Sequence, residues 1–490
     1  MLPRSHARPL FCLFIAAVGF WVSSCAVALG PGYTIESQEI RVQFSPEPDP
    51  RIHVDSEYQL RNTGSRPLTA IELRLPSRRS FHVAAKQITW DGAALAEQNS
   101  PFSPRNTVVT LPQPWKVSER HALHLSAEFQ PPASGQTGFS FSPDAFFLPS
   151  EGWAPELLPS EGLFGTGGVP PTQWRLQVRV PDGFLVHTSG SPAKKSRGGR
   201  EIVVQSMQHS VDRYPFVVAG LYKETHLDSG SGSTVFLWTR AQQDSARLRD
   251  SAEAVVRAFQ AYDAAFGPRS QKSQPFWVVE CPVVAGCFTS TESSYASLLN
   301  AEPNSVSSQL ASLDTLLLDF NGGAPKLAAA PALAASWLGY GQNPGFYEQR
   351  LPLSALPAFA SALGQEAIEG PSARTETIRR ALRMIPKSAE ARKPEDETVL
   401  RAKSFLFFYA VQERFGRESF RRAINHMLSA RQGHGFNLND FISAFEEETH
   451  QNVAEFVRLW MKRPGVPDDF RARYENASAS IVINSKETMP

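Results

Sequence analysis

The stretch Ser229-Gly230-Ser231-Gly232-Ser233 separates two parts of the chain that differ in the spacing of their apolar residues. Before it, apolar and polar residues alternate, which is typical of β-strands with one exposed face. After it, apolar residues recur every three to four positions, which is typical of amphipathic helices. Because Gly and Ser are common in flexible linkers, we interpret this stretch as the junction between a β domain and a mainly helical domain.

The alternation before the junction is clearest in residues 41–44, 70–75, 123–129 and 174–180. Turn-forming residues such as Asn62-Thr63-Gly64 and Pro181-Asp182-Gly183 lie between these segments. An antiparallel sheet with one solvated face has this pattern. The sequence therefore predicts an N-terminal β-sandwich or saddle domain over residues 30–228.

The helical pattern after the junction begins with residues 240–266 and is closed by Gly267. Residues 275–284 are apolar and β-prone. Further helices are expected at 306–320, 327–340, 375–384, 399–415, 418–428, 438–448 and 453–461. The chain is thus expected to be α+β, with a second domain over residues 234–475 and a tail over 476–490.

The composition excludes several classes of protein. The chain has 490 residues, of which 42% are hydrophobic, so it can bury two or more domain cores. Its net charge is +1, from 49 basic and 48 acidic residues, and no basic stripe indicates a nucleic-acid partner. Four cysteines are too few for a disulfide scaffold or a multi-zinc array.

The first 28 residues have the features of an export signal. Arg4 and Arg8 precede an apolar run over residues 9–22 that is too short to span a bilayer comfortably. Ala26-Val27-Ala28 is one possible cleavage site. Val22-Ser23-Ser24-Cys25 resembles a bacterial lipobox, in which Cys25 would carry the lipid. We expect a periplasmic protein or an envelope lipoprotein, with membrane contact only through such an anchor.

Three later stretches resemble the aminopeptidase N family of zinc peptidases. Residues 214–220 are similar to the strand that ends its β domain, and Lys403 with Gly416 and residues 418–421 is similar to the segment after its catalytic tyrosine. Residues 440–467 resemble its closing helices. The resemblance implies a β domain followed by a thermolysin-like, mostly helical catalytic-type domain.

The zinc-binding residues of that family are replaced here. The family binds zinc through H-E-x-x-H and a later glutamate, and it uses the first glutamate as general base and a tyrosine in the transition state. The turn Trp337-Leu338-Gly339 sets the register. In that register the histidine, base, second histidine, third-ligand and tyrosine positions hold Pro331, Ala332, Ala335, Ser354 and Arg401.

These five residues supply neither an imidazole nor a carboxylate, so we expect no zinc and no peptidase activity. His121 and His124 are three apart on an expected strand and should point to opposite faces. The expected function is that of an inactive homologue that binds an unknown peptide or envelope protein, or acts as a scaffold. The alternative is an active metallopeptidase with ligands that the sequence does not reveal.

The family's substrate groove has an uncertain counterpart in this chain. Gly286 fits the glycine of the family's G-x-M-E-N strand, but Phe288-Thr289-Ser290 replace the remainder, so the amine-binding carboxylate is missing. Candidate groove residues are Gly286, Phe288, Glu292, Tyr295 and Trp337.

Two cysteines lie in the same region. Cys281 and Cys287 are six apart, and in an oxidising compartment they could form a disulfide. The sequence leaves open whether they are bonded or are free buried thiols.

Overall fold

A computed structural model describes most of the chain. The described residues are 32–46, 49–74, 82–99, 106–130, 140–149, 153–158, 171–188, 191–198, 201–209, 216–230, 234–240, 245–269, 275–282, 308–312, 314–320, 330, 333–334, 336–338, 352–387, 397–430 and 437–475.

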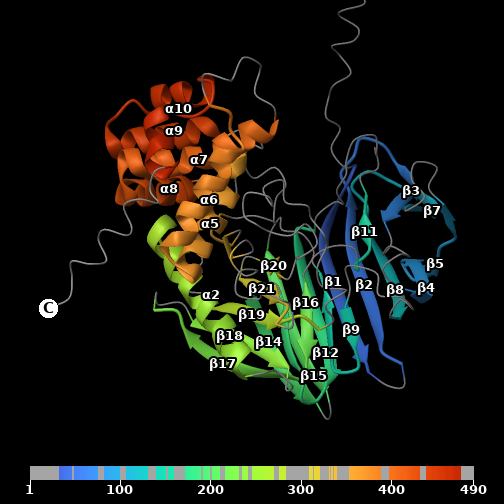
Figure 1. Ribbon diagram of the computed structural model, residues 1–490. Coiled ribbons are helices and arrows are strands. Elements are labelled where there is room, and N and C mark those ends of the chain that lie inside the picture. The colour runs from blue at the N-terminus through green and yellow to red at the C-terminus, as the bar shows by residue number, and fades with distance from the viewer. Residues whose placement is uncertain are drawn as a thin grey trace, which may run out of the picture.

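An eight-stranded sheet, called the long sheet below, runs along the β domain (Figure 1). Its order is β14 (Ser191–Gly198), β15 (Glu201–His209), β12 (Gln173–Pro181), β1 (Tyr33–Ser45), β2 (Arg51–Asn62), β8 (Arg120–Gln130), β4 (His82–Trp90) and β5 (Ala93–Ala94). Burial alternates along β1, β2, β8 and β12, as the sequence predicted. The expectation of a purely antiparallel sheet is corrected in one place, because β1 and β12 pair in parallel.

Two four-stranded sheets complete the β domain. One contains β13 (Leu185–Thr188), β16 (Val217–Gly220), β10 (Ala145–Leu148) and β9 (Ser140–Ser142); the other contains β11 (Glu156–Leu157), β3 (Leu68–Arg74), β7 (Asn106–Trp115) and β6 (Glu97–Asn99). Each shares one apolar cluster with the inward residues of the long sheet. The domain is therefore a sandwich with two neighbouring cores.

The second domain begins with a five-stranded sheet in the order β17 (Tyr222–Asp228), β18 (Thr234–Arg240), β19 (Phe276–Glu280), β21 (Thr315–Leu318) and β20 (Ser308–Ser312). β17 pairs with β18 from Tyr222 opposite Arg240 to Asp228 opposite Thr234. The chain therefore enters this sheet at Tyr222, before the Gly/Ser stretch, which lies between two antiparallel neighbours, β17 and β18. A hairpin loop and a linker have the same composition, so the sequence did not distinguish them.

The helix expected over residues 306–320 is wrong. The structure has the hairpin of β20 and β21 there, and β21 is buried between β20 and β19. A short apolar run such as Leu316-Leu317-Leu318 fits a buried strand and a buried helix equally well by periodicity. The pairing of β21 with β19 shows that this run is a strand.

Helices form most of what the structure describes of the remaining second domain. They are α2 (Ser245–Phe266), α5 (Leu356–Glu369), α6 (Pro371–Arg383), α7 (Glu397–Phe415), α8 (Arg417–Ala430), α9 (Leu438–Thr449), α10 (Val453–Lys462) and α11 (Asp468–Glu475). Figure 1 shows α5–α10 gathered at one end, with α2 extending from them to the five-stranded sheet. The sequence analysis missed α5 and α11.

The two domains meet through aromatic packing and a chain of hydrogen bonds. An apolar cluster joins β10 and β16 to β18, β19 and β21. His187 of β13 stacks on Trp277 of β19, with ring centroids 3.9 Å apart. Its Nε2 lies 2.7 Å from the hydroxyl of Thr315, which donates to Asp314 at 2.9 Å. Because the Thr315 proton is used on Asp314, Nε2 of His187 carries a proton and donates to the Thr315 oxygen.

Acid should weaken this junction. Desolvation lowers the pKa of His187 to about 4, against the opposing effect of Asp314, while an unfolded histidine titrates near 6.5. The native state therefore favours neutral His187. The stability that this preference contributes is fully present above pH 6.5 and is lost as the pH falls towards 4. Because the ring is only half-buried, we expect a loss of about 1 kcal/mol at pH 5.

Urea unfolding of the wild type and His187→Gln at pH 7 and pH 5 measures this loss. The variant should lose less stability than the wild type between the two pH values. His226→Gln is the matched control, because His226 is exposed and pairs with Glu224 at 3.1 Å. An equal pH dependence in the wild type and His187→Gln would contradict the prediction.

Candidate functional site

The structure describes two of the five positions that the resemblance assigns to the family's zinc chemistry. Pro331, Ala332 and Ala335 lie outside the described residues. Ser354 lies in the 3-10 helix η1 (Leu353–Ala355), directly before α5, and Arg401 lies in the first turns of α7.

The described residues that flank the expected zinc helix are anchored to α2. The hydroxyl of Tyr262 donates to the carbonyl of Ala330 at 2.8 Å. The indole of Trp337 donates to the carbonyl of Gly267 at 3.1 Å and packs edge-on against Phe259, with centroids 4.7 Å apart. Trp337 is 7% exposed, so its contacts are those of a core residue.

Arg401 occupies the position that the resemblance gives to the transition-state tyrosine. Its guanidinium forms an ion pair with Glu397, one turn earlier on α7. A guanidinium that is always protonated cannot exchange a proton with a substrate near neutral pH. The side chain at this position therefore lacks the acid–base chemistry of a phenol.

Most candidate groove residues fall outside the part of the chain that the structure describes: Gly286, Phe288, Glu292 and Tyr295. Cys25 and Cys287 are also outside it. Cys281, at the end of β19, is disulfide-bonded. Pairing with Cys287 remains a prediction.

The described sheet has a free edge on this side of the second domain. β20 pairs with β21 in antiparallel fashion, and none of the described strands pairs with its other side. Backbone N–H and C=O groups on such an edge are available to an added strand. The sequence analysis missed this edge, because it expected a helix there.

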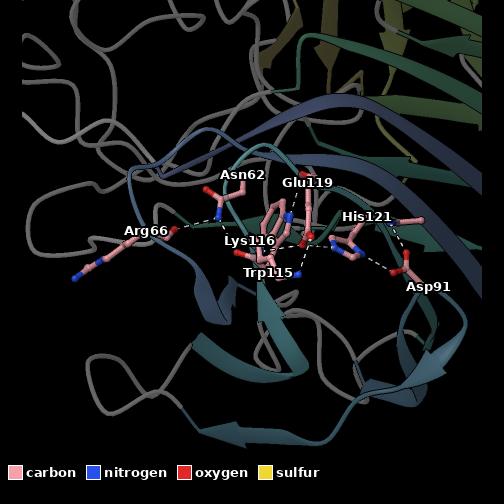
Figure 2. Close-up of polar contacts among 8 residues, drawn as sticks. Asn62, Arg66, Asp91, Trp115, Lys116, Glu119 and His121 are labelled. Carbon is pink, nitrogen blue, oxygen red and sulfur yellow. Dashed lines mark hydrogen bonds and ion pairs between the residues drawn. The ribbon is translucent and has the colours of Figure 1, made fainter.

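Two histidines of β8, His121 and His124, were considered as candidate metal ligands from the sequence, and the structure describes both. Figure 2 shows His121 between Asp91 and Glu119, with Nδ1 2.5 Å from Asp91 and Nε2 3.7 Å from Glu119. The two ring nitrogens point apart, so one ion cannot join all three groups. Partial burial raises the pKa of Asp91, but hydrogen bonds from Ala122 and His121 lower it below its usual range.

His124 lies on the other face of β8, as expected, and pairs with Asp55 at 3.4 Å. Among the residues that the structure describes, no group of three His, Cys, Asp or Glu side chains is arranged to hold a metal ion. Within the same ranges, no helix combines the length and apolarity needed to cross a bilayer.

Comparison with known proteins identifies the architecture. No protein-family model and no curated protein sequence matches the chain. Solved structures do. The M1 zinc metallopeptidase from Deinococcus radiodurans matches with a TM-score of 0.54 and 14% identity over 89% of this chain and 95% of that one.

The chain has the fold of the M1 zinc metallopeptidases. A mutant of the Deinococcus enzyme bound to a Tyr-Ser-Ala substrate matches with a TM-score of 0.54 and 14% identity, over 89% of this chain and 96% of that one. A two-domain M1 mutant bound to L-arginine matches with a TM-score of 0.54 and 14% identity, over 89% and 95%. The α+β fold predicted from the sequence is confirmed, and at 14% identity the likeness concerns the M1 fold alone.

Proposed function

We propose that this M1-fold protein is a catalytically inactive homologue of zinc aminopeptidases that binds extended peptides at the cell envelope. The observation that carries the proposal is the donor set at the zinc positions. Pro331, Ala332 and Ala335 have no side-chain donor, Ser354 is a poor zinc ligand and Arg401 is a permanent cation. These residues do not fit zinc.

Export is supported by the disulfide at Cys281. Structural disulfides persist in oxidising compartments and are rare in the cytosol. Together with the apolar segment at residues 9–22, this favours a periplasmic or lipid-anchored location for the protein. Mass spectrometry of the mature N-terminus tests whether Cys25 is acylated or removed.

Purified wild-type protein should contain well below one zinc per chain after dialysis against zinc, and it should release no amine from aminoacyl amides. Metal analysis by mass spectrometry and a hydrolysis assay with and without EDTA measure both. Stoichiometric zinc with EDTA-sensitive turnover would instead establish the active metallopeptidase.

A reconstructed site provides the matched control. The variant Pro331→His/Ala335→His/Ser354→Glu restores two imidazoles four residues apart and a carboxylate, which is the ligand set that zinc needs. We expect this variant, unlike the wild type, to bind one zinc per chain. A folded variant without zinc would count against the register on which the degenerate site depends.

The free edge of β20 is the proposed peptide-binding element. An extended peptide can add to such an edge through main-chain hydrogen bonds. The Tyr-Ser-Ala tripeptide, which a structural neighbour binds as substrate, is a suitable probe. Because the amine-binding carboxylate of the family is replaced near Phe288, N-acetylation of the probe should not weaken binding. N-methylation of the backbone amides of the probe should weaken binding.

Calorimetry with the three probes tests this mode of binding. We expect a dissociation constant on the order of 1 mM for the free and acetylated tripeptides. For the N-methylated peptide we expect a loss of about tenfold, because one or two hydrogen bonds are removed. Equal binding of the methylated peptide would contradict strand addition at β20.

A further inference from the structure

Two apolar clusters adjoin on the inward face of the eight-stranded sheet. We call the boundary between them, around Gln38 and Ser56, the seam. One cluster contains Trp174 and Trp153, and the other contains Tyr58 and Leu157. The segment 153–158 crosses from one cluster to the other. Two tyrosines of the long sheet hold it there: Tyr58 donates to the carbonyl of Pro155 at 2.6 Å, and Tyr33 donates to that of Leu158.

Polar side chains from three neighbouring strands meet on this seam. Gln38 of β1 lies opposite Trp174 of β12 on one side and Tyr58 of β2 on the other. Ser56 is the next inward residue of β2, opposite Ile40. These residues are at most 2% exposed.

Several polar atoms here make no hydrogen bond of normal geometry. Burial raises the pKa of Tyr58, and Ser56 and Gln38 lie close enough to its hydroxyl to lower that pKa in part. Neither amide atom of Gln38, nor the hydroxyl of Ser56, nor the indole nitrogens of Trp153 and Trp174 makes a hydrogen bond within the part of the chain that the structure describes. Buried polar groups in native proteins are almost always paired, with protein or with ordered water. Five unpaired atoms in one region would cost an amount comparable to the whole net stability of a domain.

The mixture of groups matches water rather than an ion. Two indoles supply donors only, while Gln38 and Ser56 supply both donors and acceptors. One water has two donors and two acceptors, so it can join these groups. Two acids lie near these groups in the described part of the chain. Glu156 pairs with Arg74 at 2.9 Å, and Glu72 accepts a hydrogen bond from Asn106 at 2.8 Å.

We propose that the seam is a built hydration site, in which one or more ordered waters bridge Gln38, Ser56 and the indoles of Trp153 and Trp174. The waters fasten the crossing segment 153–158 to the long sheet where it passes from one apolar cluster to the other. The site lies in the β domain and does not depend on the proposed peptide-binding function.

Selective ¹⁵N-indole labelling of the full chain tests the site. Water-to-indole cross-relaxation peaks are expected for Trp153 and Trp174. Trp115 and Trp337 are matched controls, because they are also buried but donate to Glu119 at 3.0 Å and Gly267 at 3.1 Å. Figure 2 shows the Trp115 contact. Absence of a water peak at both Trp153 and Trp174, with their indoles assigned, would overturn the proposal.

A variant without the acceptors gives a second readout. Gln38→Met/Ser56→Ala removes the groups that orient the water but retains the apolar volume. The water peak at Trp174 should decrease at least severalfold, while the chemical shift of the Trp337 indole, which reports on the second domain, stays unchanged. An undiminished Trp174 peak in the folded variant would show that Gln38 and Ser56 do not hold the water.

Discussion

Replacing Gly364 with alanine should destabilise the second domain by about 3 kcal/mol. Gly364 lies in α5 where this helix crosses α2. A Cβ at this position would lie 2.2 Å from the hydroxyl oxygen of Tyr262 and 3.0 Å from the Cβ of Ala330. The methyl group must therefore displace Tyr262 and break its hydrogen bond to Ala330, which is buried.

Two effects of Gly364→Ala lower the stability of the second domain, and a third partly offsets them. Overpacking costs about 1–3 kcal/mol, and leaving the Tyr262 hydroxyl and the Ala330 carbonyl without each other costs about 1–3 kcal/mol. The better helix propensity of alanine returns about 1 kcal/mol. Urea unfolding followed by circular dichroism measures the net loss.

A double mutant distinguishes this collision from a general effect on α5. Tyr262→Phe removes the atom closest to the new methyl group. Gly364→Ala should therefore cost less in the Tyr262→Phe background, with a coupling energy of about 1 kcal/mol. Additive effects of the two substitutions would show that the close approach of α5 and α2 at Gly364 is not as described.

Lys403→Met should cost about 2–3 kcal/mol of unfolding free energy. Lys403 of α7 is fully buried, and its ammonium donates to the carbonyls of Met461, at 3.2 Å, and Arg463. These carbonyls lie at the C-terminal end of α10, where carbonyl groups have no N–H partner within the helix. Methionine keeps the volume but removes the donor from both partly buried hydrogen bonds. Relief of the buried charge offsets part of the loss.

Arg401→Met is the matched control on the same helix. Arg401 is 35% exposed, and its ion pair with Glu397 is local. Exposed pairs of this kind contribute about 0.2–1 kcal/mol, so the control should change stability little. Equal losses for Lys403→Met and Arg401→Met in urea unfolding would argue against the role of Lys403 as a clamp on α10.

The candidate site could be predicted from the sequence only as a set of positions. The motif spacing around Trp337 predicts which residues stand at the zinc positions of the family that the sequence resembles. That spacing did not indicate that Trp337 would pack against Phe259 and donate a hydrogen bond to Gly267. Those contacts join segments 70 or more residues apart. Lys403 had a visible signal, a lone cation within an apolar helical run, but its partners on α10 did not.

The sequence by itself determined the α+β class, the order of a β half and a helical half, and the chemical identity of the residues at the zinc positions. Periodicity records which face of a segment is buried, and side-chain chemistry is local, so both are present in the linear chain. Only the tertiary structure decided that residues 308–312 and 315–318 are strands, that β17 joins the five-stranded sheet, and that β20 is the edge strand among the described residues. Those features depend on which strand lies beside which, and pairing between distant segments leaves no local pattern.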